Sequence, residues 1–343
     1  MTRTGGFLLG AAVAVGATAA AAASRRRRWS LQDRVVLVTG GSRGLGLAIA
    51  RRLIHEGARV AICARDRDTL ERARADLAGR GGTVAAVAAD VTDREAVSRM
   101  VQEVRERLGP LDALINNAGT IIVGPADVME ESDFRAALDV NFWGPLHVTL
   151  AVLPEMRRRR AGRIVNIASI GGKISVPHLL PYSASKFALV GLSEGLRAEL
   201  VADGIEVSTI CPGLMRTGSP RHAWFKGRHR EEYAWFSISD ALPILSMDVD
   251  RAARQVVETL RWGRAERILS APAKLAATAS ALFPGVTAEV LALVDRLLPG
   301  TDPSAARVPV KGEASQSSWS PSRLTQLADR AAKRQNQLGW DRR

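Results

Sequence analysis

The stretch RVVLVTGGSRGLG, residues 34–46, decides the fold, because a run of β-branched residues meets a glycine-rich turn there. The apolar run predicts a buried strand, and the amphipathic LGLAIARRLIHEG that overlaps its end predicts a helix. Glycines at 40, 44 and 46 permit a tight turn and a close approach to the free N–H groups at the start of that helix. A turn of this kind after the first strand favours the phosphates of a dinucleotide.

The same alternation of strand and helix continues along the chain. ARVAICAR, TVAAVAAD, LDALINNAG, GRIVNIAS and IEVSTICPG read as five further buried strands, each closed by a turn or a polar residue. Helical stretches such as DREAVSRMVQEVRERLG lie between them and end on glycine. The pattern predicts the α/β class: one Rossmann-type, doubly wound parallel sheet over residues 31–270, with ligands at the carboxyl ends of the strands and helical additions at the C-terminus.

The pattern loosens after Gly213. Residues 214–246 form a long connection that we predict to cover the substrate. It carries five aromatic residues: Trp224, Phe225, Tyr233, Trp235 and Phe236. These side chains favour an apolar substrate, or else they pack a longer C-terminal region or form an oligomer contact. Residues 271–300 predict two apolar helices broken at Pro284, which lie either on a membrane or in the core. Residues 301–343 are rich in Ser, Pro, Gln and charge, and we expect disorder there with one short basic helix near the end.

The N-terminus carries a candidate membrane anchor. Residues 5–23, GGFLLGAAVAVGATAAAAA, have no charge and would span roughly 28 Å as a helix. The arginines at 25–28 would hold that flank on the cytoplasmic side, so residues 1–28 predict an uncleaved anchor with the following domain in the cytoplasm. A cleaved signal peptide and a disordered leader on a soluble cytoplasmic protein are the alternatives.

Charge, cysteine and histidine content restrict the partners. The net charge of +13 suits anionic lipid or nucleic acid, but no nucleic-acid motif accompanies it and we expect no nucleic-acid partner. Cys63 and Cys211 lie in apolar strand runs and form no disulfide framework, as in a reducing compartment. His147 and His178 are interpreted as structural residues, and no cluster has the spacing of a metal site, so no metal is predicted.

The end of the second strand indicates which dinucleotide binds. An acidic residue there would bond the ribose 2′-OH of NAD, whereas a basic residue would suit the 2′-phosphate of NADP. The sequence is AICARD, with Arg65 at that position, and Arg43 lies within the glycine-rich turn. The two arginines favour NADP(H) over NAD(H), and Asp66 is interpreted as the cap of the next helix.

Seven motifs together resemble the short-chain dehydrogenase/reductase family over residues 31–270. They are TGGSRGLG, the Asp90 that ends the third strand, NNAG at 116–119, Asn141 in DVNFWG, Ser169 in NIAS, YSASK with Tyr182 and Lys186, and CPGLMRT. They occur in the family's order and spacing, including thirteen residues from Ser169 to Tyr182. The separation of Tyr182 and Lys186 and the glycine spacing disfavour enoyl reductases and epimerases.

The resemblance implies roles for individual residues. Tyr182 would be the general acid/base, Ser169 would polarise the substrate carbonyl, Lys186 would bond the nicotinamide ribose, and Asn141 would hold a water in a proton relay. The implied cofactor-binding residues are Gly40, Ser42, Arg43, Gly44, Leu45, Gly46, Arg65, Asp90, Val91, Asn117, Ala118, Gly119, Tyr182, Lys186, Pro212, Gly213 and Thr217. Because Lys186 lies one helical turn from Tyr182, we also expect its charge to lower the tyrosine pKa from about 10.

The sequence thus predicts an NADP(H)-dependent oxidoreductase that interconverts a carbonyl and an alcohol, with an apolar or lipid-like substrate. The resemblance implies a homo-oligomer, either a dimer or a tetramer. The alternative is a non-enzymatic, membrane-associated NADP-binding scaffold or redox sensor. Relatives of that kind lose the tyrosine or the lysine, and this chain has both.

Overall fold

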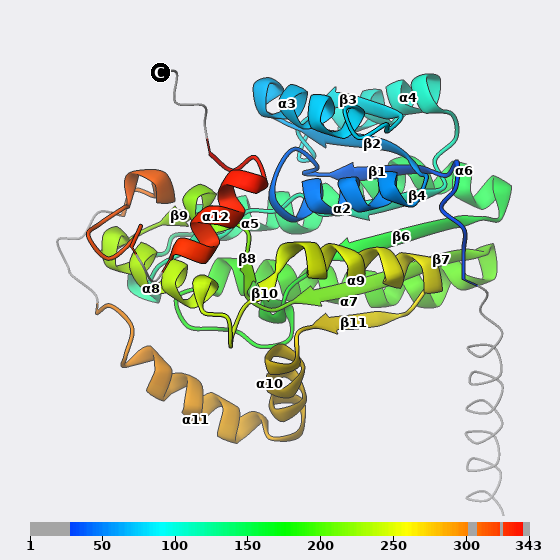
Figure 1. Ribbon diagram of the computed structural model, residues 1–343. Helices are drawn as coiled ribbons and strands as arrows, with labels where there is room; N and C mark the ends of the chain where they lie inside the picture. The colour runs from blue at the N-terminus through cyan, green and yellow to red at the C-terminus, as the bar shows by residue number, and fades with distance from the viewer. Residues whose placement is uncertain (1–27, 301–306, 323–324, 339–343) are drawn as a thin grey trace, which may run out of the picture.

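A parallel sheet forms the centre of the protein (Figure 1). The structure is a computed structural model that describes residues 28–300, 307–322 and 325–338, so the predicted anchor at 5–23 lies outside the described residues. The sheet has seven strands in the order β11-β7-β6-β4-β1-β2-β3. Their bounds are β1 Val35–Thr39, β2 Arg59–Ala64, β3 Val84–Ala88, β4 Ala113–Asn116, β6 Gly162–Ile167, β7 Ile205–Pro212 and β11 Glu266–Leu269. The Rossmann-type fold predicted from the alternating pattern is therefore confirmed.

Helices cover both faces of the sheet. Val36 of β1 pairs in parallel register with Val60 of β2 and with Ala113 of β4, which places β1 in the interior. One face packs against α2 (Gly44–His55), α3 (Arg67–Ala78) and α9 (Val249–Trp262). The other packs against α4 (Arg94–Leu108), α6 (Gly144–Arg159) and the C-terminal part of α7 (Leu180–Leu200).

Helix α4 illustrates how the sequence sets these elements. Asp93 caps its start by accepting hydrogen bonds from the backbone N–H groups of Glu95 and Ala96. Gly109, with a φ of 91°, ends it. Its buried residues, Val97, Met100, Val101, Val104 and Leu108, recur at helical spacing on the sheet side. Burial of each of these side chains contributes about 1.5–3 kcal/mol to the stability of the fold.

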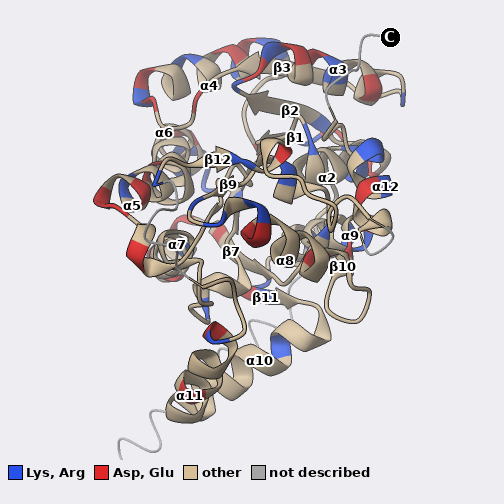
Figure 2. Ribbon diagram, turned by 90° about the vertical axis from the view of Figure 1, so that its left-hand side faces the viewer, with Lys and Arg blue, Asp and Glu red and all other residues tan. Residues whose placement is uncertain are grey.

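The C-terminal part of the chain adds smaller elements around the carboxyl edge of the sheet. They are β8 (Met215–Arg216), β9 (Trp224–Phe225), α8 (His229–Ala241), β10 (Met247–Asp248), α10 (Ala271–Leu282), α11 (Pro284–Asp295), β12 (Val310–Lys311) and α12 (Gln326–Arg334). Strand β9 joins β12 and β5 (Ile122–Val123) in a three-stranded sheet. Helices α10 and α11 project away from the domain and carry few charges (Figure 2).

The described part of the C-terminal tail is ordered, contrary to the disorder expected for residues 301–343. Strand β12 pairs antiparallel with β9 through Val310 and Phe225, and α12 is the short basic helix expected near the end. Composition misled the prediction because the tail has few large apolar residues. Small alanines and polar contacts hold it instead: Ala331 and Ala332 of α12 are buried.

One helical run, Glu131–Arg159, is long and apolar enough to cross a membrane by length and composition alone, within the ranges that the structure describes. It joins α5 (Glu131–Leu138), the π-helical turn η2 (Asp139–Trp143) and α6, and 44% of its apolar window is buried in the domain. Since α6 packs on the sheet, we interpret this run as a core helix.

Candidate active site

The glycine-rich turn lies at the carboxyl end of β1. The Thr39 hydroxyl accepts hydrogen bonds from the backbone N–H groups of Asn117 (2.9 Å) and Ala118 (3.1 Å), which ties the turn to the end of β4. Gly40 has a φ of +63°, and a Cβ at Gly46 would lie 2.2 Å from the Gly40 carbonyl oxygen. These two positions therefore require glycine. Ser42 and Leu45 are buried in the same turn and at the start of α2.

Helix α2 begins at Gly44 with no acidic residue in its first turn and no side-chain cap. Its N-terminus is thus an electropositive end suited to a phosphate. Arg43 precedes it in extended conformation. The pKa of Arg43 is lowered, first by burial and then by the positive charge of Arg65, so the two arginines act on each other across the turn.

Arg65 follows β2 with a side chain that is 71% exposed, and its guanidinium lies 3.6 Å from the Asp90 carboxylate. Asp66 caps α3 by accepting a hydrogen bond from the Thr69 backbone N–H at 2.7 Å. The acid beside Arg65 is therefore engaged in helix capping. Arg65, the basic residue at the end of β2, is thus exposed on the surface with Asp90 as its ion-pair partner.

Ser169, Tyr182 and Lys186 converge beside the carboxyl end of β6. Ser169 lies just beyond that strand, and its hydroxyl accepts a hydrogen bond of 3.0 Å from the Gly171 N–H. A Cβ at Gly171 would lie 3.1 Å from the Tyr182 ring and 3.5 Å from the Ser169 Oγ, so the two side chains face the same small space. Lys186, one turn further along α7, is 4% exposed, and its Nζ lies 5.8 Å from the centre of the Tyr182 ring. That Nζ donates a hydrogen bond of 3.0 Å to the Ile167 carbonyl. The three predicted side chains thus occupy one site.

The pKa prediction for Tyr182 is wrong for this structure. Burial raises the pKa of Tyr182 to about 12, and the hydrogen bond from Ser169 lowers it by less than burial raises it. Burial also lowers the pKa of Lys186 to about 8. Desolvation penalises the charged form of both groups, so it outweighs the attraction between ammonium and phenolate that the helical spacing suggested.

Asn141 lies in the π-helical turn η2 and is fully buried. Its Nδ2 donates to the Thr120 carbonyl (3.0 Å) and to the Ser185 hydroxyl (2.9 Å), and its Oδ1 accepts from the Thr120 N–H (3.0 Å). Ser185 donates in turn to the Tyr182 carbonyl at 2.7 Å. Ser185 was missed in the sequence, although its place within YSASK was a signal. Single π-turns inside α-helices are frequent at functional sites.

The remaining predicted residues lie at the same edge of the sheet. A Cβ at Gly119 would lie 3.0 Å from the Asn141 Oδ1 and 3.6 Å from the Lys186 Nζ. Thr217 is 3% exposed, and its hydroxyl accepts from the Ser219 N–H at 3.1 Å. Val91 is buried beyond β3, Pro212 ends β7, and Gly213 follows it.

The comparisons with known proteins agree with this geometry. The family described as short chain dehydrogenase matches residues 34–224, which is more than half of the chain. The chain belongs to this family. A dehydrogenase/reductase SDR family protein 7-like protein of Anopheles gambiae is 40% identical over 193 residues, 54% of this chain and 61% of that relative's length.

Two solved structures resemble this member of the family. An actinorhodin polyketide ketoreductase determined with NADPH has a TM-score of 0.63 and 34% identity, covering 69% of this chain and 95% of its own. An NAD+-bound xylitol dehydrogenase has a TM-score of 0.62 and 28% identity, covering 70% and 98%. The donor set described above, a helix start with no side-chain cap beside two arginines, fits a nicotinamide dinucleotide.

Four of the aromatic residues in the segment 214–246 contact one another: Phe225, Tyr233, Trp235 and Phe236. Phe225, Tyr233 and Phe236 are buried, with edge-to-face ring distances of 5.4 Å (Phe225–Tyr233) and 6.1 Å (Phe225–Phe236). Phe225 also belongs to β9, which pairs with β12. Packing of the longer C-terminal region, one of the two interpretations left open by the sequence, therefore accounts for these three side chains.

Helix α8 brings two buried acids to the site that no sequence motif signalled. Glu232 binds His178 (Nδ1 to Oε1, 2.8 Å) and Trp235 (Nε1 to Oε2, 2.6 Å), which joins α8 to the loop before Tyr182. Asp240 is 4% exposed, and burial raises its pKa to about 7 despite hydrogen bonds to the Met215 backbone and the Ser219 side chain. The charge of Asp240 also raises the pKa of Tyr182.

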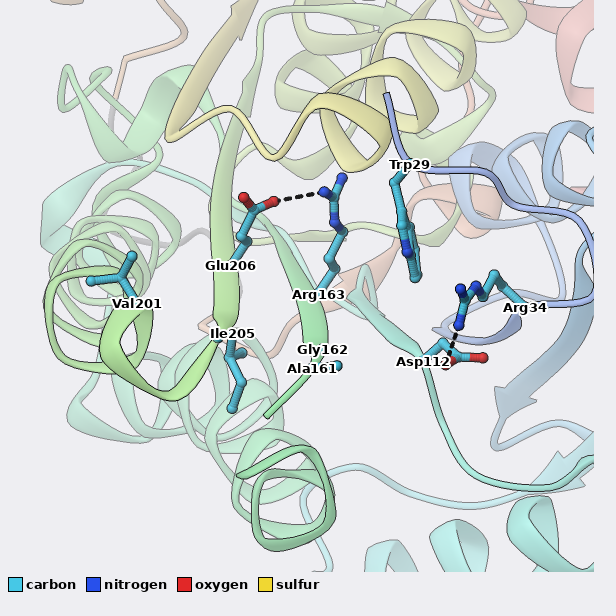
Figure 3. A pocket seen from close by; sticks show the side chains of 10 residues that line it. Trp29, Arg34, Asp112, Ala161, Gly162, Arg163, Val201, Ile205 and Glu206 are labelled. Atoms are coloured by element: carbon cyan, nitrogen blue, oxygen red, sulfur yellow. Dashed lines mark hydrogen bonds and ion pairs between the residues drawn. The ribbon is translucent and has the colours of Figure 1, made fainter. Parts of the chain in front are cut away.

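A cavity of about 330 Å³ lies at the opposite edge of the sheet (Figure 3). The Trp29 ring lies there with the Arg34 and Arg163 guanidiniums 5.2 and 4.8 Å from its centre. The cavity borders the amino ends of β4, β6 and β7, away from Tyr182, so it is separate from the candidate active site. Among the described residues, no group of three or more His, Cys, Asp or Glu side chains is arranged to hold a metal ion.

Proposed function

We propose that this dehydrogenase interconverts a carbonyl and an alcohol with NADP(H). The observation that carries the proposal is the convergence of three side chains: Ser169 and Tyr182 both lie against Gly171, and the Nζ of the buried Lys186 lies 5.8 Å from the centre of the Tyr182 ring. A nicotinamide cofactor, when bound, supplies or accepts the hydride. The protein must then hold the carbonyl oxygen and move one proton to or from it.

The side chains divide this work. In reduction, the Ser169 hydroxyl holds the carbonyl oxygen and Tyr182, protonated at neutral pH, donates its proton to the developing alkoxide. The Lys186 ammonium stabilises the phenolate that remains and holds the cofactor ribose. Asn141 fixes the start of α7 through Ser185 and holds a water that returns the proton to this pair.

Arg43 and Arg65 support NADP(H) over NAD(H). Both lie where the 2′-phosphate of the adenosine ribose would lie in this fold, and Asp66 is engaged as a helix cap. The NADPH-bound ketoreductase neighbour agrees with this choice, while the xylitol dehydrogenase neighbour binds NAD+. Replacing Arg65 by Ser should weaken NADPH binding and leave NADH binding nearly unchanged in a fluorescence titration. Equal losses for both cofactors would contradict this assignment.

Tyr182→Phe tests the mechanism, with Tyr233→Phe as the matched control. We expect Tyr182→Phe to lower kcat by at least about a hundredfold for ketone reduction while NADPH affinity is preserved. Tyr233 is the only other tyrosine in the chain, and its replacement should leave turnover close to that of the parent protein. Unchanged turnover in Tyr182→Phe would refute the mechanism.

The substrate that we propose is apolar or lipid-like. A cavity of about 280 Å³ lies between the loop before Tyr182 and α11, and its lining includes Pro177, Leu180 and Leu291. The lining also includes Ser175, His178 and Asp295, so the cavity is mixed in polarity, and its apolar part is the part that would contact a hydrocarbon tail. Across a series of ketones, kcat/KM should rise with chain length, and Leu291→Asp should flatten that rise. No preference for long chains would contradict the proposal.

We also propose that the protein is anchored to a membrane through residues 1–28, with the catalytic domain cytoplasmic. The apolar stretch 5–23 and the arginines after it support this, as do the exposed apolar residues of α10 and α11: Leu275, Leu282, Phe283, Val286, Val290 and Leu293 are each more than half exposed. Membrane fractionation with and without residues 1–28 tests it. A fully soluble intact protein would end this proposal.

A homo-oligomer is the assembly that we propose. Trp143 and Leu150, seven residues apart along the same helical run, are each 46% exposed, and Phe187 of α7 is 44% exposed. Large apolar side chains at helical spacing on a surface are typical of a contact between copies. Leu150→Glu should dissociate the assembly, which light scattering would detect as a lower molar mass. A parent protein that is itself monomeric would refute the proposed oligomer.

A further inference from the structure

The last described segment of the chain lies on the glycine-rich turn. The Gln335 carbonyl accepts a hydrogen bond of 2.9 Å from the backbone N–H of Gly44, the first residue of α2. Asn336 donates through Nδ2 to the carbonyls of Ser42 (2.9 Å) and Thr69 (3.0 Å), and its Oδ1 accepts from Arg72 at 3.2 Å. A carbonyl oxygen therefore engages the helix end that favours an anion.

Gln337 contacts two segments near the proposed nucleotide site, the start of α2 and the segment that follows Thr217. A Cβ at Gly44 would lie 2.6 Å from the Gln337 Nε2, and a Cβ at Gly218, next to Thr217, would lie 3.4 Å from the Gln337 Cβ. The Gln337 side chain is 6% exposed, and its Oε1 has no hydrogen-bond partner among the described residues. A buried amide oxygen without a partner costs about 1–3 kcal/mol, so this contact is one that a better ligand can displace.

His222 joins this segment to Arg43. Its Nε2 lies 3.0 Å from the Gln337 carbonyl, which can only accept, so that nitrogen carries the proton. The Nδ1 is then free to accept from the Arg43 guanidinium at 3.2 Å. One of the two arginines assigned to the 2′-phosphate is thus held by the closed arrangement.

We propose that residues 335–337 occupy the diphosphate part of the nucleotide site and that dinucleotide binding displaces them. The segment acts as an internal competitor of the dinucleotide. The Gln335 carbonyl binds the Gly44 N–H, and the Gln337 side chain lies between Gly44 and Gly218. His222, which binds Gln337, also holds Arg43. The apparent dissociation constant for NADPH is then the intrinsic one multiplied by the inverse of the open fraction. The proposal rests on the proposed nucleotide site but not on the proton-transfer role of Tyr182.

The test is NADPH binding without a carbonyl substrate, measured by calorimetry on the full chain. Asn336→Ala removes the side-chain bonds to the turn and places alanine at a φ of +54°, so it loosens the closed segment. We expect it to tighten NADPH binding by about tenfold. Gln326→Ala, an exposed neutral change at the start of α12, is the matched control and should bind as the parent does.

Hydrogen exchange gives a second measurement that does not depend on any variant. Saturating NADPH should speed exchange of the amides in residues 325–338, because the segment leaves the turn. Slower exchange with NADPH, or weaker binding by Asn336→Ala, would show that the segment is instead part of the nucleotide site and would overturn the proposal. If the carbonyl-reductase function were wrong, turnover would be absent while the tenfold change in NADPH affinity remained, so the two failures differ.

Discussion

Asp240 links the pH dependence of stability to the active site. Its carboxyl group is 4% exposed on α8, and burial raises its pKa to about 7 from 3.8 in the unfolded chain. A group whose pKa rises on folding contributes stability that is fully present below its unfolded pKa and is lost as the pH rises through its folded pKa. Native stability should therefore fall between about pH 4 and pH 7.

The size of this loss follows from the shift. Three pKa units correspond to about 4 kcal/mol in total, at about 1.4 kcal/mol per unit. Between pH 5 and pH 8, the two pKa values give a loss of about 2.5 kcal/mol from this one carboxyl group. Asp240→Asn removes the titration and keeps the shape of the side chain.

Urea unfolding of the parent and Asp240→Asn at pH 5 and pH 8 measures this contribution. The other titrating groups are present in both proteins, so the difference between the two pH dependences isolates Asp240. From pH 5 to pH 8, we expect the free energy of unfolding of the parent to fall by about 2.5 kcal/mol relative to that of the variant. Parallel curves for the two proteins would show that the carboxyl group is not desolvated and would refute the reasoning.

Other predictions concern glycines and a buried ion pair. Gly46→Ala should destabilise the fold by about 1–3 kcal/mol, because its Cβ would lie 2.2 Å from the Gly40 carbonyl oxygen. Gly191→Ala on α7, where no atom lies within 4 Å of the new Cβ, should stabilise it by about 0.4–1 kcal/mol. Lys226→Met should cost about 3–5 kcal/mol, because the buried Asp133 carboxylate, 2.7 Å from the Lys226 Nζ, loses its partner. Urea unfolding checks all three, and a reversed sign in any one would contradict that prediction.

The fold and the clustered motifs could be predicted because local patterns encode them. Alternating apolar runs and helical periodicity fix the parallel sheet, and the strand ends then bring the turn at Gly40 and the residues near Tyr182 to one edge. Ser169 and Tyr182 meet because each lies at an element end that this topology places at that edge.

Long-range contacts of the C-terminal region could not be predicted in this way. Asn336 contacts Ser42, which lies 294 residues away in the sequence. The sequence around Asn336 has few large apolar residues, so no periodic apolar pattern predicted this contact. No sequence motif signalled Asp240 and Glu232, because burial of a polar side chain depends on what packs over its helix. The prediction of a lowered pKa for Tyr182 was wrong for the same reason. Spacing places a lysine nearby, but only the packed structure shows how far the tyrosine hydroxyl is removed from water.

Burial gives the resting site a definite protonation state. With a pKa of about 12 the Tyr182 hydroxyl keeps its proton throughout the neutral range, and with a pKa of about 8 Lys186 is mainly an ammonium at pH 7. The pair is therefore arranged to donate a proton, which is what carbonyl reduction requires. We expect the rate of carbonyl reduction to fall only as the pH rises past the pKa of Lys186, about 8. The rate of alcohol oxidation should increase as the pH approaches the pKa of Tyr182, about 12. Rate profiles in both directions measure this, and an oxidation rate that is already maximal at pH 7 would mean that bound cofactor and substrate, rather than burial, set the tyrosine pKa.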